Sequence, residues 1–523
     1  MPARHVARTL VVVSYDLPTR AATRTLRFLA GAACIAGCAS TGVSSQLPSA
    51  APAPTVRLAL RQFIDSLVDA PAFRSAQWGV LVVDPTRAET LYARNADKLF
   101  MPASNMKILT GATALAQLGA DYRWSTSMSA RGVVRDGVLV GDLIVRGNGD
   151  PSVSDHMQSG DALAPLRALA DSLRAHGVTR VRGHLVAAPS PFTDSPLGYG
   201  WSWSDLDDAY SAGVDALYFN EGFTQVVVRG GTRAGDAVRA STRPASTYPM
   251  LVVNARTSAP LAAGSTAADS VAAHAITVSQ DSSHTGVLVA GTVAAGDSVV
   301  TDITFRHQGE AYLAALLEAM ASRGIVVEQG GGAPAGDETP LFSMRSPALR
   351  EVLPYFEKPS QNQIGELLFK TLALEKTGVG RADSAANVVS RQVLAWGAAA
   401  DGFAIRDGSG LSRHDYLSPR TLVTVLAAIM SHADFRAFYD ALPIAGVDGT
   451  IRNRMKGTAA QGNVHGKTGT LDKARSLSGY VTTADGRRLI FSALCNNYVV
   501  PTRSVDQVSD AIAVRLASLR LDR

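Results

Sequence analysis

Cysteine is scarce in this chain of 523 residues, which has three: Cys34, Cys38 and Cys495. Two of them lie in one apolar segment near the N-terminus, so the sequence offers no framework of disulfide bonds. Hydrophobic residues make up 46% of the chain and charged residues 18%, a balance that excludes a fibrous or broadly disordered protein. The chain is too long for one ordinary core, and we expect two or three domains.

The chain also has little excess charge outside its N-terminal segment. The net charge is +5, and residues 1–37 hold five arginines against a single aspartate, which accounts for +4 of it. The rest of the chain is therefore close to neutral, and its charge gives no support to a nucleic-acid partner. Lysine is rare, with eight residues, so each lysine is easier to assess as a functional group.

The N-terminal segment has the pattern of an export signal. Arginines precede an apolar run, residues 28–37, that is too short to span a bilayer. Residues 35–38, Ile-Ala-Gly-Cys, resemble the bacterial lipobox, in which the cysteine is acylated and becomes the new N-terminus. An ordinary signal peptide that is cut nearby is the alternative.

A polar stretch rich in Ser, Pro and Ala follows Cys38, as the tether of an anchored protein requires. We therefore expect a lipoprotein signal peptide over residues 1–37 and a flexible tether over 38–56. The expected location is the periplasm, with Cys38 carrying the lipid. The alanine after Cys38 favours the outer membrane over the inner one.

Apolar periodicity predicts a helix over residues 57–68, a strand over 78–83 and a helix over 106–118. Helices are expected again over 361–374 and 419–430. The strands expected over 477–481 and 489–494 are separated by a hairpin turn and followed by a final helix. Helices that flank an antiparallel sheet with strands from both ends of the chain make an α+β domain, which we assign to residues 57–124 and 336–523.

Between residues 125 and 335 the pattern changes. Short β-like runs broken by Gly, Asp and Ser occur at residues 138–145, 181–186, 217–228 and 287–293. We interpret residues 125–335 as one or two inserted, mostly β subdomains.

Ser104 and Lys107 form a single SxxK pattern at the beginning of an expected helix. Residues three apart share one helix face, so the amine can come within hydrogen-bond reach of the hydroxyl. A serine is a poor nucleophile without a base, and a lysine can be that base if burial and nearby positive charge lower its pKa. Taken alone, the pattern more often means a helix-capping serine and a surface lysine.

Two further patterns carry similar side chains. Ser360 and Asn362 stand at the beginning of a predicted helix, where a capping role is the simple interpretation. The other pattern precedes a predicted strand and consists of Lys467, Thr468, Gly469 and Thr470. A lysine and a hydroxyl on a strand edge form an anion site, and the glycine lets a substrate backbone approach closely.

The KTG tripeptide occurs a second time, at residues 376–378. There it follows a predicted helix, so we expect Lys376 to interact with the helix dipole and Gly378 to end the helix in a left-handed conformation. We assign a structural role to this copy.

In chain order, the SxxK, SxN and KTG patterns match the active-site set described for β-lactamases and penicillin-binding proteins. Other segments resemble, more narrowly, the D-alanyl-D-alanine carboxypeptidase/endopeptidase family, the class C low-molecular-mass penicillin-binding proteins. These segments are residues 100–107 (FMPASNMK), 149–151 (GDP), 200–203 (GWSW), 407–413 (DGSGLSR), 442–446 (LPIAG) and 448–450 (DGT). The resemblance extends from about residue 60 to 520, nearly the whole mature chain.

The resemblance implies a penicillin-binding/β-lactamase-like transpeptidase domain, an antiparallel sheet flanked by helices, with a large insertion of two small subdomains. It implies a serine D,D-peptidase that hydrolyses the D-alanyl-D-alanine end of peptidoglycan stem peptides through an acyl-enzyme. The resemblance leaves open whether the enzyme also cleaves D-alanyl-diaminopimelate cross-links, as an endopeptidase would. β-Lactam antibiotics would be covalent inhibitors, and no metal or cofactor is required.

The resemblance also implies roles for single residues. Ser104 would form the acyl-enzyme, and Lys107 would accept its proton. Ser360 would relay that proton to the leaving amine, and Asn362 would hold the substrate amide. In the third motif, Lys467 and Thr468 would bind the terminal carboxylate, and the backbone N–H groups of Ser104 and Thr470 would form the oxyanion hole. Gln361 departs from the family, where many members carry Asp.

Three alternatives stay open at this stage. A class A β-lactamase shares the three motifs but has about half this length, and we find no convincing deacylating Glu motif in the inserted region. An esterase of the SxxK type is the second. A non-catalytic, peptidoglycan-binding lipoprotein would be expected to have lost Ser104, Lys107 or Lys467, and all three are present.

Overall fold

The computed structural model describes residues 54–521 except 263, 265, 267–269, 271–272, 282–285 and 331–336. The predicted signal peptide and Cys38 lie outside these residues. The first helix begins at Pro54, so it takes up the last residues of the expected tether. Among the helices described, none combines the length and the apolar character needed to cross a membrane.

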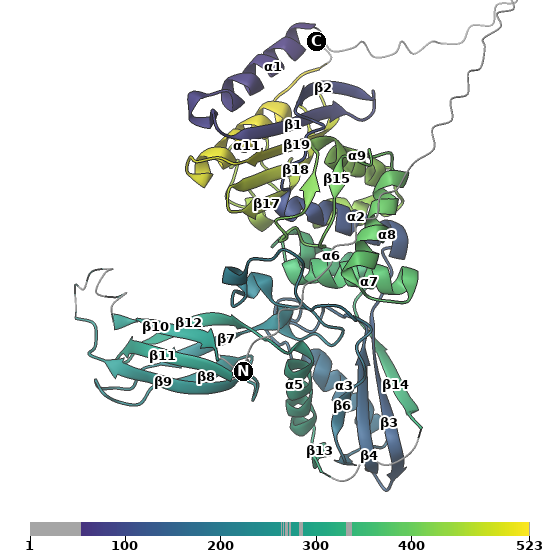
Figure 1. Ribbon diagram of the computed structural model, residues 1–523, viewed down its shortest axis with the longest axis vertical. Coiled ribbons are helices and arrows are strands. Elements are labelled where there is room, and N and C mark those ends of the chain that lie inside the picture. Colours follow the sequence, from purple (N-terminus) through teal and green to yellow (C-terminus); the bar gives the residue numbers. More distant parts are fainter. Residues whose placement is uncertain are drawn as a thin grey trace, which may run out of the picture. The chain divides into compact units, whose positions relative to one another are not determined.

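The first sheet is antiparallel and joins strands from both ends of the described chain, in the order β17-β18-β19-β1-β2. Its strands are β1 (Gln77–Asp84), β2 (Glu89–Arg94), β17 (His465–Leu471), β18 (Ala474–Thr482) and β19 (Arg488–Asn496). Helices α1 (Pro54–Val68) and α11 (Thr502–Ala517) pack on one face (Figure 1). Helices cover the other face as well, which explains why β1 and β19 are nearly continuous apolar runs.

The helical layer on that second face surrounds α2 (Met106–Leu118). The first ten residues of α2 are all buried, as expected of a helix that is mainly apolar around its whole circumference. The helices around it are α6 (Leu349–Glu357), α7 (Asn362–Thr377), α8 (Ala382–Ala395), α9 (Pro419–Met430) and α10 (Phe435–Ala441). The short strands β15 (Phe403–Ala404) and β16 (Tyr416–Leu417) pair with each other. This layer places the beginning of α2 beside β17.

The chain leaves the helical layer at β3 and builds a second sheet in the order β13-β5-β4-β3-β14, with β6 beside β4. The strands are β3 (Ser125–Arg135), β4 (Val138–Gly147), β5 (Arg180–Arg182), β6 (Leu185–Ala187), β13 (Val326–Val327) and β14 (Thr339–Arg345). Helices α3 (Ala164–Ala175) and α5 (Gln308–Ser322) share one hydrophobic core with this sheet.

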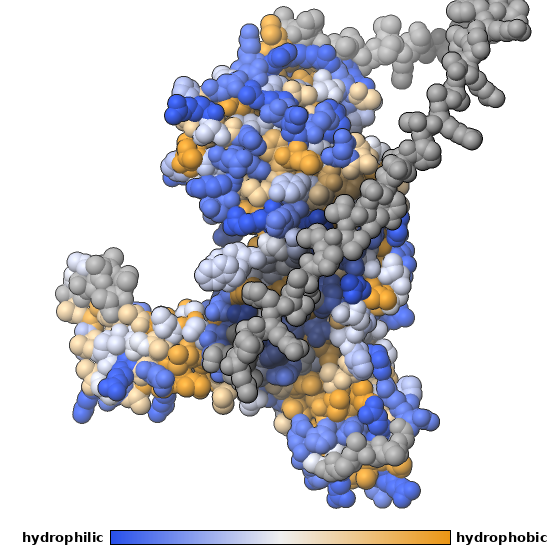
Figure 2. All heavy atoms as spheres, in the orientation of Figure 1, coloured by the Kyte–Doolittle hydropathy of each residue, from blue (hydrophilic) through white to orange (hydrophobic). Residues whose placement is uncertain are grey.

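Two three-stranded sheets enclose a separate small core, in which apolar side chains of both sheets meet. One sheet contains β7 (Phe223–Arg229), β8 (Arg239–Arg243) and β12 (Ser298–Thr304); the other contains β9 (Met250–Ser258), β10 (Ile276–Gln280) and β11 (Gly286–Ala294). Apolar side chains also lie on its outside: Met250 and Val252 of β9 and Val300 of β12 are exposed. Figure 2 shows hydrophobic side chains on this part of the surface.

The inserted region differs from the sequence prediction in four ways. Its first part is not mostly β, because α3 and α5 supply a large share of its core. The strand expected over 181–186 is broken at Gly183, where a Cβ would lie 2.2 Å from the carbonyl oxygen of Gly141. The strand expected from residue 217 begins only at Phe223, after a tight turn. In addition, β14 pairs with β3 of the inserted sheet, beyond the expected boundary at residue 335.

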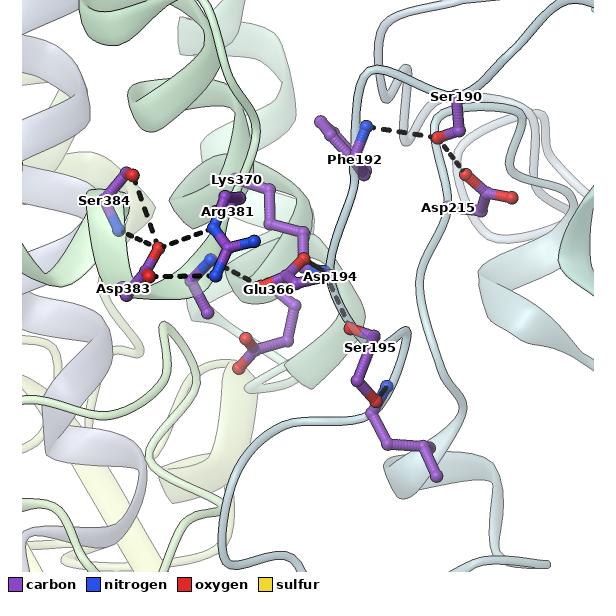
Figure 3. Close-up of polar contacts among 12 residues, drawn as sticks. Ser190, Phe192, Asp194, Ser195, Asp215, Glu366, Lys370, Arg381, Asp383 and Ser384 are labelled. Carbon is purple, nitrogen blue, oxygen red and sulfur yellow. Dashed lines mark hydrogen bonds and ion pairs between the residues drawn. The ribbon is translucent and has the colours of Figure 1, made fainter.

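A buried ion pair fastens the inserted region to α7. The Nζ atom of Lys370 lies 2.5 Å from Oδ1 of Asp194 and 2.9 Å from the carbonyl oxygen of Ser195. The other carboxylate oxygen of Asp194 accepts the backbone N–H of Ala382, at the beginning of α8 (Figure 3). A lysine buried to this degree needs such a partner, because an unpaired charge in the interior is costly.

Candidate active site

Ser104 and Lys107 meet at the junction of a 3₁₀ turn (Ala103–Asn105) and α2. The Nζ atom of Lys107 lies 3.0 Å from Oγ of Ser104. It also lies 2.6 Å from Oδ1 of Asn362 and 2.8 Å from the carbonyl oxygen of Ser409. Lys107 is completely buried, so these three oxygens surround its amine.

The surroundings of Lys107 suit a base. Burial, together with the positive charge of Lys467, lowers the pKa of Lys107 to about 7. Burial disfavours the charged ammonium, and a neighbouring cation does the same. A substantial fraction of Lys107 is therefore neutral near pH 7 and can accept the proton of Ser104.

The second motif lies in a tight turn before α7. Ser360 has a φ of +65°, a left-handed conformation that is unfavourable for a residue with a Cβ atom. Its Oγ atom accepts a hydrogen bond of 2.7 Å from Nζ of Lys467. Asn362 faces Lys107 through its Oδ1 atom and donates through Nδ2 to the carbonyl oxygen of Tyr210, in the inserted region. The second motif thus contacts both functional lysines.

Lys467 is fully buried on β17, and burial lowers its pKa to about 8, whereas the charge of Glu357 opposes that change. The backbone of Lys467 is fixed from the first motif, because Nδ2 of Asn105 donates to its carbonyl oxygen at 2.8 Å. The neighbouring hydroxyl of Thr468 lies 2.7 Å from the hydroxyl of Thr450. Asn105 and Thr450 belong to the motifs at residues 100–107 and 448–450, but the sequence did not indicate a role for either side chain.

β17 lies at the edge of its sheet, and only part of its outer side is free to pair with another strand. The N–H of Gly466 donates to the carbonyl oxygen of Pro443, so the strand is already paired at that end. At Gly469, a Cβ would lie 2.5 Å from the carbonyl oxygen of Pro102 and 3.0 Å from the backbone nitrogen of Ser104. Only glycine allows the strand to lie this close to the nucleophile.

An open cleft of about 510 Å³ brings these parts together. Its lining includes Ser104, Ser360, Asn362 and Thr470, and the inserted region contributes Asp205 and Tyr210; the other residues are Gly410, Leu411, Arg413, Leu471, Asp472, Tyr498 and Thr502. A larger cavity of about 650 Å³ lies within the inserted region, and no predicted site residue lines it. The structure therefore gathers the three predicted motifs at one cleft.

The second KTG tripeptide lies elsewhere. Lys376 is in the last turn of α7, and Gly378 ends the helix with a φ of +78°. The N–H of Gly378 donates to the carbonyl oxygen of Leu374, as in a helix terminated by a left-handed residue. The structural role predicted for this copy is confirmed.

A loop that the sequence analysis left without a role supports the base. Ser409, whose carbonyl oxygen accepts from Lys107, has its own N–H held at 2.8 Å by Oε1 of Glu366. Asp407 accepts the N–H groups of Gly410 and Ser412, both at 2.6 Å. Two buried carboxylates thus fix the loop. The DGSG pattern, small residues beside an acid, was the available signal.

Glu357 is a second residue that no sequence signal marked. It ends α6, is fully buried, and neither carboxylate oxygen has a hydrogen-bond partner among the described residues. Burial raises its pKa to about 7, while the positive charges of Lys467 and Lys107 oppose the rise. It is the carboxylate whose charge both functional lysines experience.

The α+β fold and a cleft that combines SxxK, SxN and KTG define the class of serine enzymes that contains the penicillin-binding proteins and the β-lactamases. A sequence profile of the D-Ala-D-Ala carboxypeptidase 3 (S13) family matches residues 60–519. The chain belongs to this family and is a serine-type carboxypeptidase.

Individual relatives agree with this assignment. A D-alanyl-D-alanine carboxypeptidase of Actinomadura sp. strain R39 is 35% identical over 488 residues, which cover 90% of this chain and 87% of that protein. A D-alanyl-D-alanine carboxypeptidase of Haemophilus influenzae is 26% identical over 77% of this chain and 82% of its own length. The crystal structure of penicillin binding protein 4 from Haemophilus influenzae matches the fold with a TM-score of 0.72 at 22% identity, covering 87% of this chain and 99% of that one.

Proposed function

We propose that the protein hydrolyses the D-alanyl-D-alanine bond of peptidoglycan stem peptides, with Ser104 as nucleophile and Lys107 as base. The observation that carries this proposal is the 3.0 Å distance between Nζ of Lys107 and Oγ of Ser104, in a setting that lowers the pKa of Lys107 to about 7. Relatives that are named for this activity support the choice of substrate.

Acylation begins when neutral Lys107 takes the proton of Ser104 and Oγ attacks the carbonyl carbon of the penultimate D-alanine. The negative charge that develops on the carbonyl oxygen is stabilised by the N–H groups of Ser104 and Thr470. Such donors contribute about 3–4 kcal/mol each in other acyl-transfer enzymes. The C–N bond then breaks, and Ser360, held by Lys467, passes to the leaving amine the proton that Lys107 took from Ser104, which leaves Lys107 neutral again. Water then attacks the carbonyl carbon of the acyl-enzyme and gives a proton to Lys107. The ester bond to Oγ breaks, and Lys107 passes this proton to Ser104, which is free again.

The third motif would bind the terminal carboxylate of the substrate. Lys467 supplies a buried positive charge, and the hydroxyl of Thr468 lies on the same strand. A charge-assisted contact of this kind is stronger than a neutral hydrogen bond. The free edge of β17 beside Ser104 can pair with the extended backbone of the stem peptide.

Mass spectrometry of purified muropeptides, incubated with the mature protein and with Ser104→Ala, tests this function. We expect a pentapeptide to lose one D-alanine with the wild-type protein and to stay intact with the variant. Conversion of cross-linked dimers to monomers would show that the protein also acts as an endopeptidase. If the wild-type protein leaves both the pentapeptide and the dimers unchanged, the proposed function is wrong.

We also propose that Cys38 carries lipid and holds the enzyme at a membrane facing the periplasm, preferably the outer membrane. The support is the Ile-Ala-Gly-Cys sequence at residues 35–38 and the polar stretch behind it. Cell fractionation should find the wild-type protein with membranes and Cys38→Ala in the soluble fraction. A membrane-bound Cys38→Ala variant would show that another anchor exists.

A further inference from the structure

Two tight turns with left-handed residues meet at the second motif. One contains Ser360, at φ +65°. The other belongs to the inserted region and contains Asn220 and Glu221, at φ +47° and +55°. Residues with a Cβ atom persist in this conformation only where the surrounding structure holds them, and such positions gather at functional sites.

Among the described residues, one side-chain hydrogen bond joins the two turns. Oε2 of Glu221 accepts a hydrogen bond of 2.6 Å from Nε2 of Gln361. The amide of Gln361 is fixed at its other end too, because Oε1 accepts the N–H of Gln363 at 2.6 Å as the N-cap of α7. An aspartate at position 361 would instead place a second carboxylate against Glu221. The glutamine therefore suits this partner.

The turn that presents Glu221 is itself firmly supported. The N–H of Asn220 donates to the carbonyl oxygen of Val153 at 2.7 Å, and its Oδ1 accepts the N–H of Asp155 at 2.9 Å. Its Nδ2 atom donates to the carbonyl oxygen of Phe223, where β7 begins. Glu221 thus connects the core of the inserted region to the residue between Ser360 and Asn362.

We propose that Glu221 is a positioning residue for acyl transfer. By holding Gln361, it keeps Ser360 within reach of Lys467 and Asn362 within reach of Lys107. The inserted region then contributes to the acylation step through a contact that touches no substrate. This inference rests on the proposed function, since it assumes that acylation of Ser104 uses the second motif.

Second-order rates of acylation by fluorescent penicillin, measured on the full mature chain, test the inference. We expect Glu221→Ala and Gln361→Ala each to slow acylation at least about fivefold, and the double variant to be no slower than the slower single one, because both remove one coupled interaction. Glu221→Gln should keep a rate near that of the wild type, since its amide oxygen can still accept from Gln361. A wild-type rate for Glu221→Ala, or additive losses in the double variant, would overturn the inference.

Asp194→Asn is the matched control, because Asp194 also joins the inserted region to α7 but contacts Lys370 and not the second motif (Figure 3). It should lower the melting temperature and leave the acylation rate within about twofold of the wild type. A loss as large as that of Glu221→Ala would mean that any loosening of the inserted region slows acylation, which contradicts a specific role for Glu221. If the wild-type protein is not labelled at all, the proposed function fails; if it is labelled and Glu221→Ala reacts equally fast, only this inference fails.

Discussion

The Nζ atom of Lys467 lies 2.7 Å from Oγ of Ser360, which joins the third motif to the second. Lys467 is the lysine of the KTG copy on β17, whereas Lys376, in the other copy, ends α7. One lysine is buried beside the nucleophile and the other is exposed, so the two copies can be told apart by substitution.

Lys467→Ala should lower the second-order rate of acylation by penicillin at least about tenfold, because it removes a charge-assisted contact to the carboxylate worth about 1.4 kcal/mol or more. Lys376→Ala should leave the rate nearly unchanged. Stopped-flow measurement on the two purified variants decides between the copies. Equal rates, or a larger loss for Lys376→Ala, would show that the anion site has been assigned to the wrong KTG copy.

The pH dependence of acylation should be bell-shaped. Lys107 works as a neutral base, so the rate should rise with pH through its pKa of about 7. Lys467 works as a cation, so the rate should fall as pH rises through its pKa of about 8. Acylation rates between pH 5 and 10 measure both limbs. A rate that still increases above pH 9 would contradict the role given to the charge of Lys467.

Glu357→Gln should move the alkaline limb of this bell toward lower pH. The negative charge of Glu357 raises the pKa of Lys467, and since burial raises the pKa of Glu357 itself to about 7, that charge is present mainly above pH 7. Acylation should therefore slow at pH 8, where Lys467 loses its charge, and change little at acidic pH, where Glu357 is already neutral. Glu375→Gln, which changes an exposed carboxylate on α7, should leave the profile in place. An unchanged profile for Glu357→Gln would show that Glu357 has no influence on either lysine.

Gly469→Ala should slow acylation by about a hundredfold or more, the scale of losing an oxyanion-hole donor. The new Cβ atom would lie 2.5 Å from the carbonyl oxygen of Pro102, which forces β17 away from Ser104. Gly309→Ala is the control, since the nearest atom to its Cβ is 3.8 Å away. If both variants react as fast as the wild type, the strand does not need its close approach to the nucleophile.

Much of the fold around the site could be predicted from the sequence. The helix expected over residues 106–118 is α2 and the one over 419–430 is α9, because both have strong apolar patterns and clear ends. Cys495 directly follows the apolar run expected as a strand over residues 489–494, and it is buried in β19, where burial raises its pKa to about 12. The grouping of the three motifs at one cleft was implied by their resemblance to the active-site set of β-lactamases and penicillin-binding proteins.

Other features depend on tertiary contacts that no local pattern reveals. Nothing in the sequence around Glu357 indicates that its carboxylate ends up buried near two lysines. The turn at Asn220 and Glu221 interrupts the run that we expected to be one strand, and its contacts with Val153 and Gln361 hold it in place. Helix α3 is different, because its apolar residues Leu166, Leu169 and Leu173 follow a helical spacing from which the helix could have been predicted.

The most direct test of the account is to locate the covalent adduct that penicillin forms. Intact-mass spectrometry followed by peptide mapping should find one acyl group on the wild-type protein, attached to Ser104. Ser104→Ala should carry none, and Lys107→Ala should be nearly unreactive at neutral pH, because the hydroxyl then lacks its base. An adduct on another serine, or rapid labelling of Lys107→Ala, would contradict the assignment of Ser104 as nucleophile and Lys107 as base.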